Sequence, residues 1–247
     1  MIYFIGAGPG AEDLITIRGA KILSEADVII YAGSLVNFDL VKKYAKPQAK
    51  IYDSSKMNLK QISEIMIEAQ NKNLNLARLH TGDPSIYGAI SEQIKILREN
   101  NINFEIIPGV SSFCSVAASL KISYTIPEIS QNILISRLSG RTINPENVKA
   151  EIYFLSSGNI KELCEKLINS GHSQNEKIAL VYKSSWPDEK IFYTKINELE
   201  KIANENNIKN HALIILGKCL EEFETRSKLY DENFSTGFRE AVKTRPR

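Results

Sequence analysis

Short runs of β-branched and aromatic residues alternate with segments of helical period along the first half of this chain, and no other feature restricts the fold as much. This is the pattern of strands joined by helical crossovers, which place successive strands parallel in one sheet. Strands are expected at 2–5, 28–31, 50–52, 76–79 and 104–107, with helical stripes of apolar residues at 59–69 and 90–97. One α/β domain is therefore expected over residues 1–119.

The pattern changes at a mixed segment around 121–128 that contains Pro127. Beyond it, strand-like runs recur at 133–136, 152–155, 179–182, 192–193 and 212–216, separated by amphipathic helical segments. A second α/β domain is expected over residues 120–247. The fold class predicted for the whole chain is thus α/β, with two domains.

Composition excludes several classes of protein. The 31 Lys and Arg residues nearly balance 29 Asp and Glu residues, which gives no overall attraction to nucleic acid or to an anionic membrane. No apolar stretch approaches the length of a membrane span, and the first residues lack the pattern of a signal peptide. The three cysteines and three histidines form no metal-ligand motif. A cytoplasmic protein without a bound metal is expected.

A glycine-rich loop, GAGPGA at residues 6–11, follows the first expected strand and precedes a helix. This resembles the loop that brings backbone close to a pyrophosphate in dinucleotide-binding folds. However, the next strand ends in YAGS at 31–34 without the acid that would bind a ribose, and Pro9 removes one N–H group. Dinucleotide binding and a purely structural turn both remain open for this loop.

Two more loops follow expected strands of the same sheet, HTGDPSIYG at 80–88 and PGVSS at 108–112. Parallel strands end at one edge, which is where α/β proteins bind ligands. Helix capping alone would explain Asp83 and Pro84. Three consecutive strand ends with such turns exceed what packing requires, so a binding site at this edge is predicted.

The loops 6–10, 31–36, 80–88, 108–113 and 127–131 occur in the order and spacing of the tetrapyrrole methylases, and the chain resembles that family over nearly its whole length. AGSLV and HTGDPSIYG resemble, in particular, the precorrin-4 and cobalt-precorrin-4 C11-methyltransferases of cobalamin biosynthesis. Two departures stand out. The stretch between 142 and 151 is shorter than expected, and the acid of the YDRLV segment in uroporphyrinogen-methylating relatives has no counterpart in the 31–36 loop.

The resemblance implies methylation of C11 of (cobalt-)precorrin-4 by S-adenosylmethionine, to give (cobalt-)precorrin-5. It also implies a class III methyltransferase fold, a cofactor trough between the domains and a homodimer. The positions that match the cofactor site are Pro9, Gly82, Asp83, Ile86, Ser111, Ser112, Leu155 and Ala212. Carboxylates of the substrate are expected to meet basic and polar residues drawn from Tyr31, Ser34, Arg78, His80, Arg137, Arg141 and Lys183.

No catalytic residue is assigned, because the sulfonium is already an activated leaving group; Tyr31 and His80 are candidates for a general base by loop position only. Cobalt would belong to the substrate rather than to the protein. Each basic residue outside the matched motifs has an alternative as a solvated surface charge. The competing functions are methylation of uroporphyrinogen, another precorrin, RNA or protein, and, from another class, a dinucleotide-binding oxidoreductase or nucleotide sensor.

Overall fold

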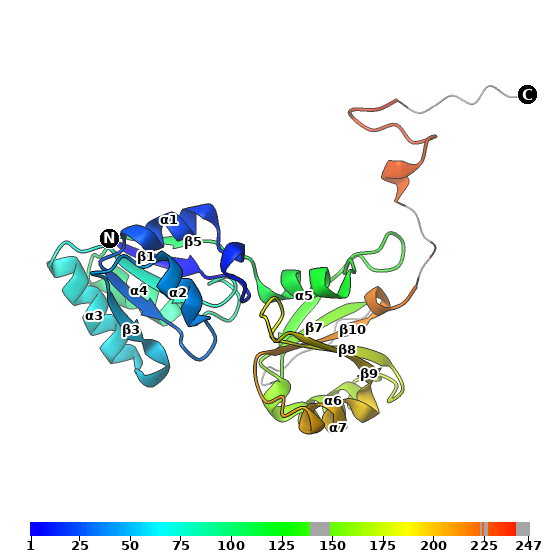
Figure 1. Cartoon of the computed structure of the whole chain (residues 1–247). Coiled ribbons are helices and arrows are strands. Elements are labelled where there is room, and N and C mark those ends of the chain that lie inside the picture. The colour runs from blue at the N-terminus through cyan, green and yellow to red at the C-terminus, as the bar shows by residue number, and fades with distance from the viewer. Residues whose placement is uncertain (139–148, 223, 225–226, 241–247) are drawn as a thin grey trace, which may run out of the picture. The chain divides into compact units, whose positions relative to one another are not determined.

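A computed structural model describes residues 1–138, 149–222, 224 and 227–240. Contacts within the chain divide it into two compact units (Figure 1). The first comprises Met1–Leu120 together with Val181–Ile191, and the second comprises Lys121–Leu180 and Phe192–Arg247. The segment Val181–Ile191 therefore belongs to the first unit, although it lies inside the second domain expected from the sequence.

The first unit is built on a five-stranded sheet in the order β3-β2-β4-β1-β5. Every neighbouring pair in it is parallel, so all five strands end at one edge, as the alternation in the sequence predicts. The strands are β1 (Ile2–Gly6), β2 (Val28–Tyr31), β3 (Lys50–Asp53), β4 (Leu76–His80) and β5 (Phe104–Ile107).

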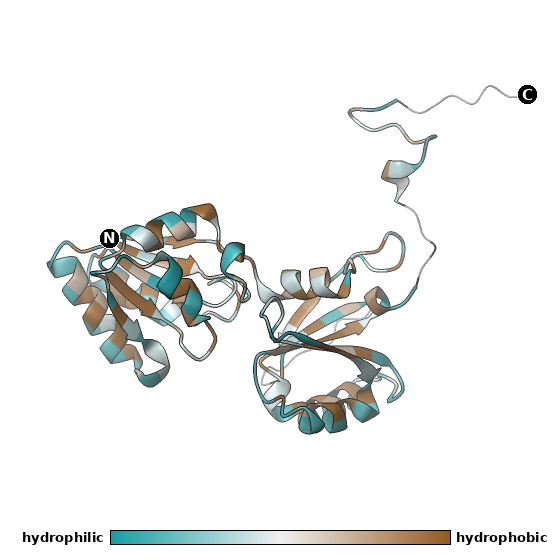
Figure 2. Ribbon diagram, viewed as in Figure 1, coloured by the Kyte–Doolittle hydropathy of each residue, from teal (hydrophilic) through white to brown (hydrophobic). Residues whose placement is uncertain are grey.

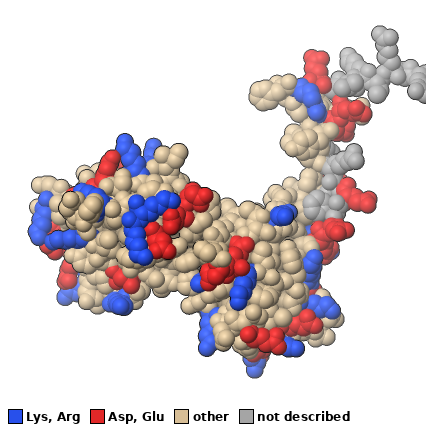
Figure 3. All heavy atoms as spheres, viewed as in Figure 1, with Lys and Arg blue, Asp and Glu red and all other residues tan. Residues whose placement is uncertain are grey.

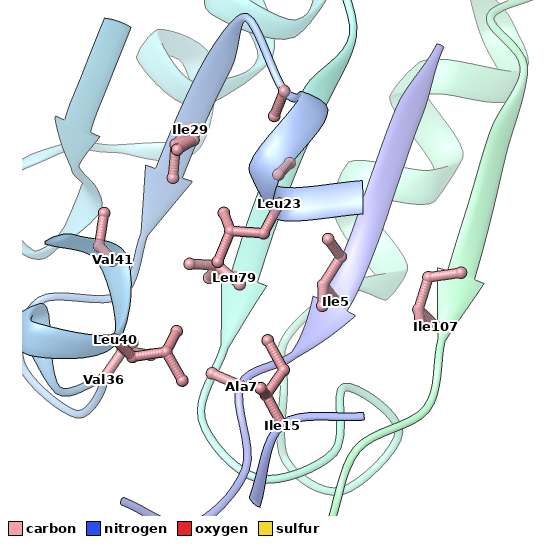
Figure 4. Close-up of a cluster of buried hydrophobic side chains, with 12 residues drawn as sticks. Ile5, Ala7, Ile15, Leu23, Ile29, Val36, Leu40, Val41, Leu79 and Ile107 are labelled. Carbon is pink, nitrogen blue, oxygen red and sulfur yellow. The ribbon is translucent and has the colours of Figure 1, made fainter. Parts of the chain in front are cut away.

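Five helices connect and follow these strands: α1 (Ile17–Glu25), α2 (Phe38–Tyr44), α3 (Leu59–Asn71), α4 (Ser91–Glu99) and α5 (Ser112–Leu120). Alternate strand residues face two separate cores, as the period of two requires. One core packs Ile5, Ile29 and Leu79 against Leu23 of α1 and Leu40 of α2 (Figure 4). The other core packs the opposite face of the sheet against α3 and α4.

The second unit contains a mixed five-stranded sheet in the order β6-β7-β10-β8-β9. β6 runs parallel to β7, whereas β10 runs antiparallel to it. Its elements are β6 (Leu134–Arg137), β7 (Ala150–Phe154), β8 (Lys177–Tyr182), β9 (Lys190–Lys195), β10 (Ala212–Gly217), α6 (Ile160–Asn169) and α7 (Leu199–Glu205). Most strands of both sheets are brown, hence apolar, in Figure 2, and α6 and α7 show both brown and teal, as expected of amphipathic helices. The predicted α/β class is confirmed.

Short 3₁₀ turns complete the described chain: Glu12–Leu14, Ser54–Lys56, Ser157–Asn159, Ile196–Glu198, Lys218–Leu220 and Lys228–Tyr230. None of the helices that the structure describes is long and apolar enough to cross a membrane. On the face shown in Figure 3, acidic and basic side chains are interspersed over both units rather than gathered by sign.

Candidate functional site

Three glycines bring the ends of β1, β4 and β5 into direct backbone contact. A Cβ atom at Gly6 would lie 2.6 Å from the Gly109 Cα and 2.6 Å from the Gly82 carbonyl oxygen. A Cβ at Gly109 would lie 2.2 Å from that same oxygen. Since the neighbours are backbone atoms, no side chain can move aside, and only glycine fits at Gly6 and Gly109.

The loops after β1 and β4 are also hydrogen-bonded to each other. Gly82 N–H donates to the Gly8 carbonyl at 2.8 Å, and Gly8 N–H donates to the Gly82 carbonyl at 3.3 Å. Both glycines have positive φ, +79° at Gly8 and +61° at Gly82. The Gly82 N–H is thus already used within the edge. What Gly82 offers is the absence of a side chain.

Asp83 ties the β4 loop to the β5 loop. One carboxylate oxygen accepts from Ser85 N–H at 2.8 Å, and the other accepts from Gly109 N–H at 2.8 Å. Burial raises the pKa of Asp83, but the hydrogen bonds from Ser85 and Gly109 outweigh it and hold the pKa below its usual value. The carboxylate is therefore ionised. It caps the turn at 84–87 rather than a helix, since the next helix, α4, begins only at Ser91, and the helix-capping alternative for Asp83 and Pro84 is wrong.

The segment Val181–Ile191 holds the first glycine loop in place. Trp186 Nε1–H donates to the Pro9 carbonyl at 3.0 Å, and a Cβ at Gly10 would lie 2.1 Å from the Trp186 ring. Ala11 N–H donates to the Ser185 hydroxyl at 3.0 Å. The Pro9 carbonyl is consequently occupied by an indole, so the loop is rigid before any ligand arrives.

Helix α5 is bound by the same segment. The Ser115 and Ser184 hydroxyls lie 2.6 Å apart, and the Ser119 hydroxyl donates to the Glu189 carboxylate at 2.8 Å. Glu189 also accepts from Ser185 N–H. These contacts fix the helix that begins at the 108–112 loop, so that the first and third expected loops are both held by the segment Val181–Ile191.

Lys183, a candidate substrate residue, lies in that segment with its ammonium 2.6 Å from Asp188. The hydrogen bond to Asp188 raises the pKa of Lys183 above its usual value. Its Nζ also lies 5.3 Å from the centroids of the Tyr182 and Trp186 rings. The ammonium is charged and held at a defined place, with one carboxylate already beside it.

His80, expected as a substrate or base residue, is buried beneath the edge rather than on it. Its ring lies 6.0 Å from that of Phe4, and Nε2 is buried without a hydrogen-bond partner among the described residues. Burial, with the neighbouring Arg78 charge, lowers the pKa of His80 to about 3, against a weaker opposing effect of the Gly88 backbone. The imidazole is neutral at physiological pH and a weak base.

Arg78, two residues earlier on β4, is buried as well. Its guanidinium donates to Gln93 and to the Ile30 and Leu79 carbonyls, at 3.2–3.4 Å. Burial lowers the pKa of Arg78 to about 10, and no acid within the described chain offsets this burial. Arg78 therefore ties β2 and β4 to α4.

The 31–36 loop follows β2 and carries two candidate substrate residues, Tyr31 and Ser34. Ser34 is exposed, and the Tyr31 ring packs against Phe38 with centroids 5.3 Å apart. The end of the neighbouring strand β3 supplies an acid, because Gly33 N–H donates to Asp53 Oδ1 at 3.1 Å. Burial first, and then the Asp53 charge, raise the pKa of Tyr31 above its usual value, so the phenol stays protonated.

The remaining candidates in the first unit lie on the 80–88 and 108–112 loops. Ile86 is partly buried just after Asp83 and Pro84. Ser111 and Ser112 lie against Gly82, whose Cβ would be 3.4 Å from the Ser111 Cα and 3.5 Å from the Ser112 nitrogen. The edge thus brings together Pro9, Gly82, Asp83, Ile86, Ser111 and Ser112, as the sequence predicts for one site.

The second unit carries three further candidates. Ile214 pairs with Tyr153 in the antiparallel β7–β10 register, which places Leu155 and Ala212 at the same end of that pair. Leu155 is 58% exposed and has a φ of +51°, unusual for a leucine. Arg137 ends β6 and is exposed. Arg141 lies outside the described residues.

No role is expected from the sequence for Asp53, Trp186 or Glu189. Each acts on a loop that is distant along the chain, so no local pattern reveals it. Locally, these contacts are indicated by Gly10 and Gly33. Neither glycine has a positive φ, so each is explained by the close approach of another side chain rather than by its backbone conformation.

Comparison with known proteins agrees with this architecture. Residues 1–200 match the family model of the tetrapyrrole (corrin/porphyrin) methylases. A cobalt-precorrin-4 C(11)-methyltransferase of Methanocaldococcus jannaschii is 45% identical over 98% of this chain and 97% of its own length. A precorrin-4 C(11)-methyltransferase of a Sinorhizobium species is 35% identical over 96% of this chain and 98% of its own.

A solved structure of a cobalt precorrin-4 methyltransferase superposes with a TM-score of 0.82 and 39% identity, over 90% of this chain and 96% of that one. The similarity extends over both units and includes all the loops of the first edge. The resemblance inferred from the 31–36 and 80–88 loops is confirmed. By sequence and by fold, this chain belongs to the tetrapyrrole (corrin/porphyrin) methylases.

Proposed function

We propose that this chain transfers the methyl group of S-adenosylmethionine to C11 of precorrin-4 or cobalt-precorrin-4, giving the corresponding precorrin-5 in cobalamin biosynthesis. The observation that carries the proposal is the 45% identity, over nearly the full length of both chains, to a relative named for this reaction. The rigid glycine edge supports it, because methyl transfer depends mainly on positioning and on exclusion of water.

The edge of the first sheet suits a ligand that needs close backbone approach. Gly6, Gly82 and Gly109 pack against one another without side chains, which brings the strand ends close together, and the partly buried Ile86 adds apolar surface for an adenine ring. The hydroxyls of Ser111 and Ser112 form no hydrogen bond with another described residue, which leaves them available to a carboxylate. S-adenosylmethionine supplies a methyl group on a positively charged sulfur that leaves readily as a thioether.

The cofactor residues proposed in the first unit act in two ways. Gly82, Ser111 and Ser112 receive the ligand, while Asp83 and Pro9 hold the loops that present them. Leu155 and Ala212 are proposed to add contacts from the second unit, where they lie at the same end of the β7–β10 pair. The Pro9 carbonyl and the Asp83 carboxylate already accept hydrogen bonds from within the chain. Replacing either residue should therefore disturb the geometry of the loops more than it removes a direct contact with the cofactor.

The tetrapyrrole carries several carboxylates and needs charge-assisted hydrogen bonds. We assign this role to Arg137, Arg141 and Lys183, with Tyr31 and Ser34 at the 31–36 loop. His80 is neutral and buried, so we assign it to the support of the 80–88 loop rather than to contact with the substrate. A homodimer, a cytoplasmic location and a substrate with or without bound cobalt complete the proposal.

Product analysis tests the proposed reaction directly. The full chain is incubated with S-adenosylmethionine labelled with ¹³C in its methyl group and with precorrin-4, cobalt-precorrin-4 or uroporphyrinogen III. We expect NMR of the product to place the label at C11 of a precorrin. Labelled product from uroporphyrinogen alone would replace the proposal with the related reaction.

Ligand stabilisation tests the cofactor site. S-adenosylhomocysteine should raise the melting temperature and NAD should not, since a ligand that binds only the native state stabilises it. Gly109→Ala, which forces a Cβ against the Gly82 carbonyl, should weaken S-adenosylhomocysteine binding about tenfold or more, equivalent to roughly 1.4 kcal/mol. Gly237→Ala is the control, because nothing lies within 4 Å of a Cβ there. Stabilisation by NAD alone would overturn the proposal in favour of a dinucleotide-binding protein.

A further inference from the structure

Two residues at the end of β3 form hydrogen bonds with the 31–36 loop, one as an acceptor and one as a donor. Asp53 Oδ1 accepts from Gly33 N–H at 3.1 Å, and the Ser54 hydroxyl donates to the Tyr31 carbonyl at 3.1 Å. The two contacts come from adjacent residues of one strand end and reach residues about twenty positions earlier in the chain. The loop is therefore held from outside, in addition to its own turn, in which the Leu35 and Val36 N–H groups donate to the Ala32 carbonyl.

Gly33 shows how closely Asp53 approaches. A Cβ atom at residue 33 would lie 2.3 Å from Oδ1 and 2.6 Å from Oδ2 of Asp53. Gly33 is not among the glycines with positive φ, so its backbone conformation alone would admit other residues. The glycine is required because the Asp53 carboxylate occupies the volume that a side chain would need.

Asp53 also brings a fixed negative charge to this place. The Ser55 N–H, which donates to Oδ1 at 2.9 Å, is the largest of several effects that hold the pKa of Asp53 below its usual value despite partial burial. The charge acts on Tyr31, whose pKa it helps to raise after burial. Asp53 thus binds the loop backbone and keeps the phenol of Tyr31 protonated.

We propose that Asp53 is a positioning residue for the tetrapyrrole: its carboxylate fixes the 31–36 loop, and so places Tyr31 and Ser34 against the substrate. This inference rests on the proposed function. The proposal gives the strand ends two roles. The loops after β1, β4 and β5 bind the cofactor, and the loop after β2, which is held by the end of β3, contacts the tetrapyrrole. Asp53 itself touches neither ligand.

Replacing Asp53 by Ala and by Asn separates position from charge. Asp53→Ala removes the acceptor, and kcat/KM for the tetrapyrrole should fall about tenfold or more, the range expected for one hydrogen bond to a charged group. The Kd of S-adenosylhomocysteine should stay within about twofold of wild type, since its loops are held by other contacts. Asp53→Asn keeps an oxygen that accepts from Gly33 N–H, and should restore most of the activity. Asp39→Ala, an exposed acid of the same unit, is the matched control.

Amide hydrogen exchange gives a readout that does not need the substrate. Asp53→Ala should speed exchange in the 31–36 loop and leave the 80–88 loop unchanged, whereas Asp53→Asn should protect the 31–36 loop nearly as well as wild type. Gly33→Ala should reproduce the effect of Asp53→Ala, because its Cβ displaces the carboxylate. The double variant should lose little more than either single one, as residues that act through one contact do.

The outcomes are distinguishable. If the wild-type chain methylates no tetrapyrrole while Asp53→Ala still releases the 31–36 loop, the proposed function fails and the positioning contact stands. Unchanged loop exchange and unchanged kcat/KM in Asp53→Ala would overturn the positioning role. It would also be overturned if Asp53→Asn were as impaired as Asp53→Ala with its loop still protected, since the charge alone would then matter.

Discussion

Each unit of the molecule encloses a histidine, and the surroundings shift the pKa values of the two rings in opposite directions. His80 lies beneath the glycine edge of the first unit beside Arg78 and Phe4, and its pKa falls to about 3. His172, in the second unit, lies 3.2 Å from Glu151 and 2.9 Å from Glu176. The hydrogen bond to Glu151, aided by Glu176, raises the pKa of His172 to about 9 despite desolvation.

The difference shows what each unit uses its histidine for. The neutral ring of His80 fills the base of the 80–88 loop without adding charge to it. The charged ring of His172 links Glu151 of β7 to Glu176, the residue before β8. Tyr153 donates a further hydrogen bond to Glu151 at 2.7 Å. A histidine in the sequence therefore predicts neither role until its neighbours are known.

The largest contrast should appear in the titration of the two rings. NMR of protein labelled with ¹⁵N at histidine should show His80 neutral from pH 8 down to pH 5, and His172 protonated at pH 7 and losing its proton near pH 9. Because the folded state resists protonation of His80, this ring reduces stability as pH falls below 6.5, the ordinary histidine pKa. Similar titration of both rings near pH 6.5 would remove the contrast.

Glu151→Gln should next show how much the charged pair contributes to the second unit. Removing Glu151 takes away the carboxylate with the larger effect on His172 and leaves Glu176 as its remaining partner, so the free energy of unfolding at pH 7 should fall by at most about 3 kcal/mol. The folded pKa of His172 is raised, so its contribution is complete below pH 6.5 and is lost as pH rises through about 9. Urea denaturation at pH 7 and pH 10 measures both.

The matched control is Glu205→Gln, which alters an exposed acid 3.9 Å from Lys201 and should change stability by less than about 0.5 kcal/mol. If Glu151→Gln lowered the free energy of unfolding as much at pH 10 as at pH 7, His172 would not be the group responsible.

The smallest effect is expected from Arg78→Met, which removes the cation beside His80. The pKa of His80 should rise but remain below its ordinary value, because burial is the larger cause and is retained. The same NMR titration measures the shift, with Arg18→Met, an exposed arginine of α1, as the comparison. A His80 pKa restored to its ordinary value would make Arg78, rather than burial, the dominant cause.

Periodicity predicted the strands well where apolar residues fill them. The expected runs 28–31 and 104–107 coincide with β2 (Val28–Tyr31) and β5 (Phe104–Ile107). It identified only 192–193 of β9 (Lys190–Lys195), because that strand is largely exposed and carries few apolar residues. β7 begins earlier than expected, at Ala150, since Glu151 is accommodated in the strand through its pairing with His172.

The loops of the site could be placed from the sequence because parallel strands share one carboxyl edge. Their internal contacts could not, since they join residues far apart: Asp53 with Gly33, Trp186 with Pro9, and Asp83 with Gly109. The protonation of His80 was equally hidden, because it depends on burial and on Arg78 rather than on the HTGDPSIYG motif.

The return of Val181–Ile191 to the first unit has a consequence for synthesis on the ribosome. When Leu120 has been made, every strand of the first sheet exists, yet the indole that binds the Pro9 carbonyl does not. The glycine loop gains that partner only after the ribosome has added most of the second unit's first half. An N-terminal unit commonly folds while the rest of the chain is still being made. Here the glycine edge of the first unit is completed only after residues 121–180 of the second unit have been added.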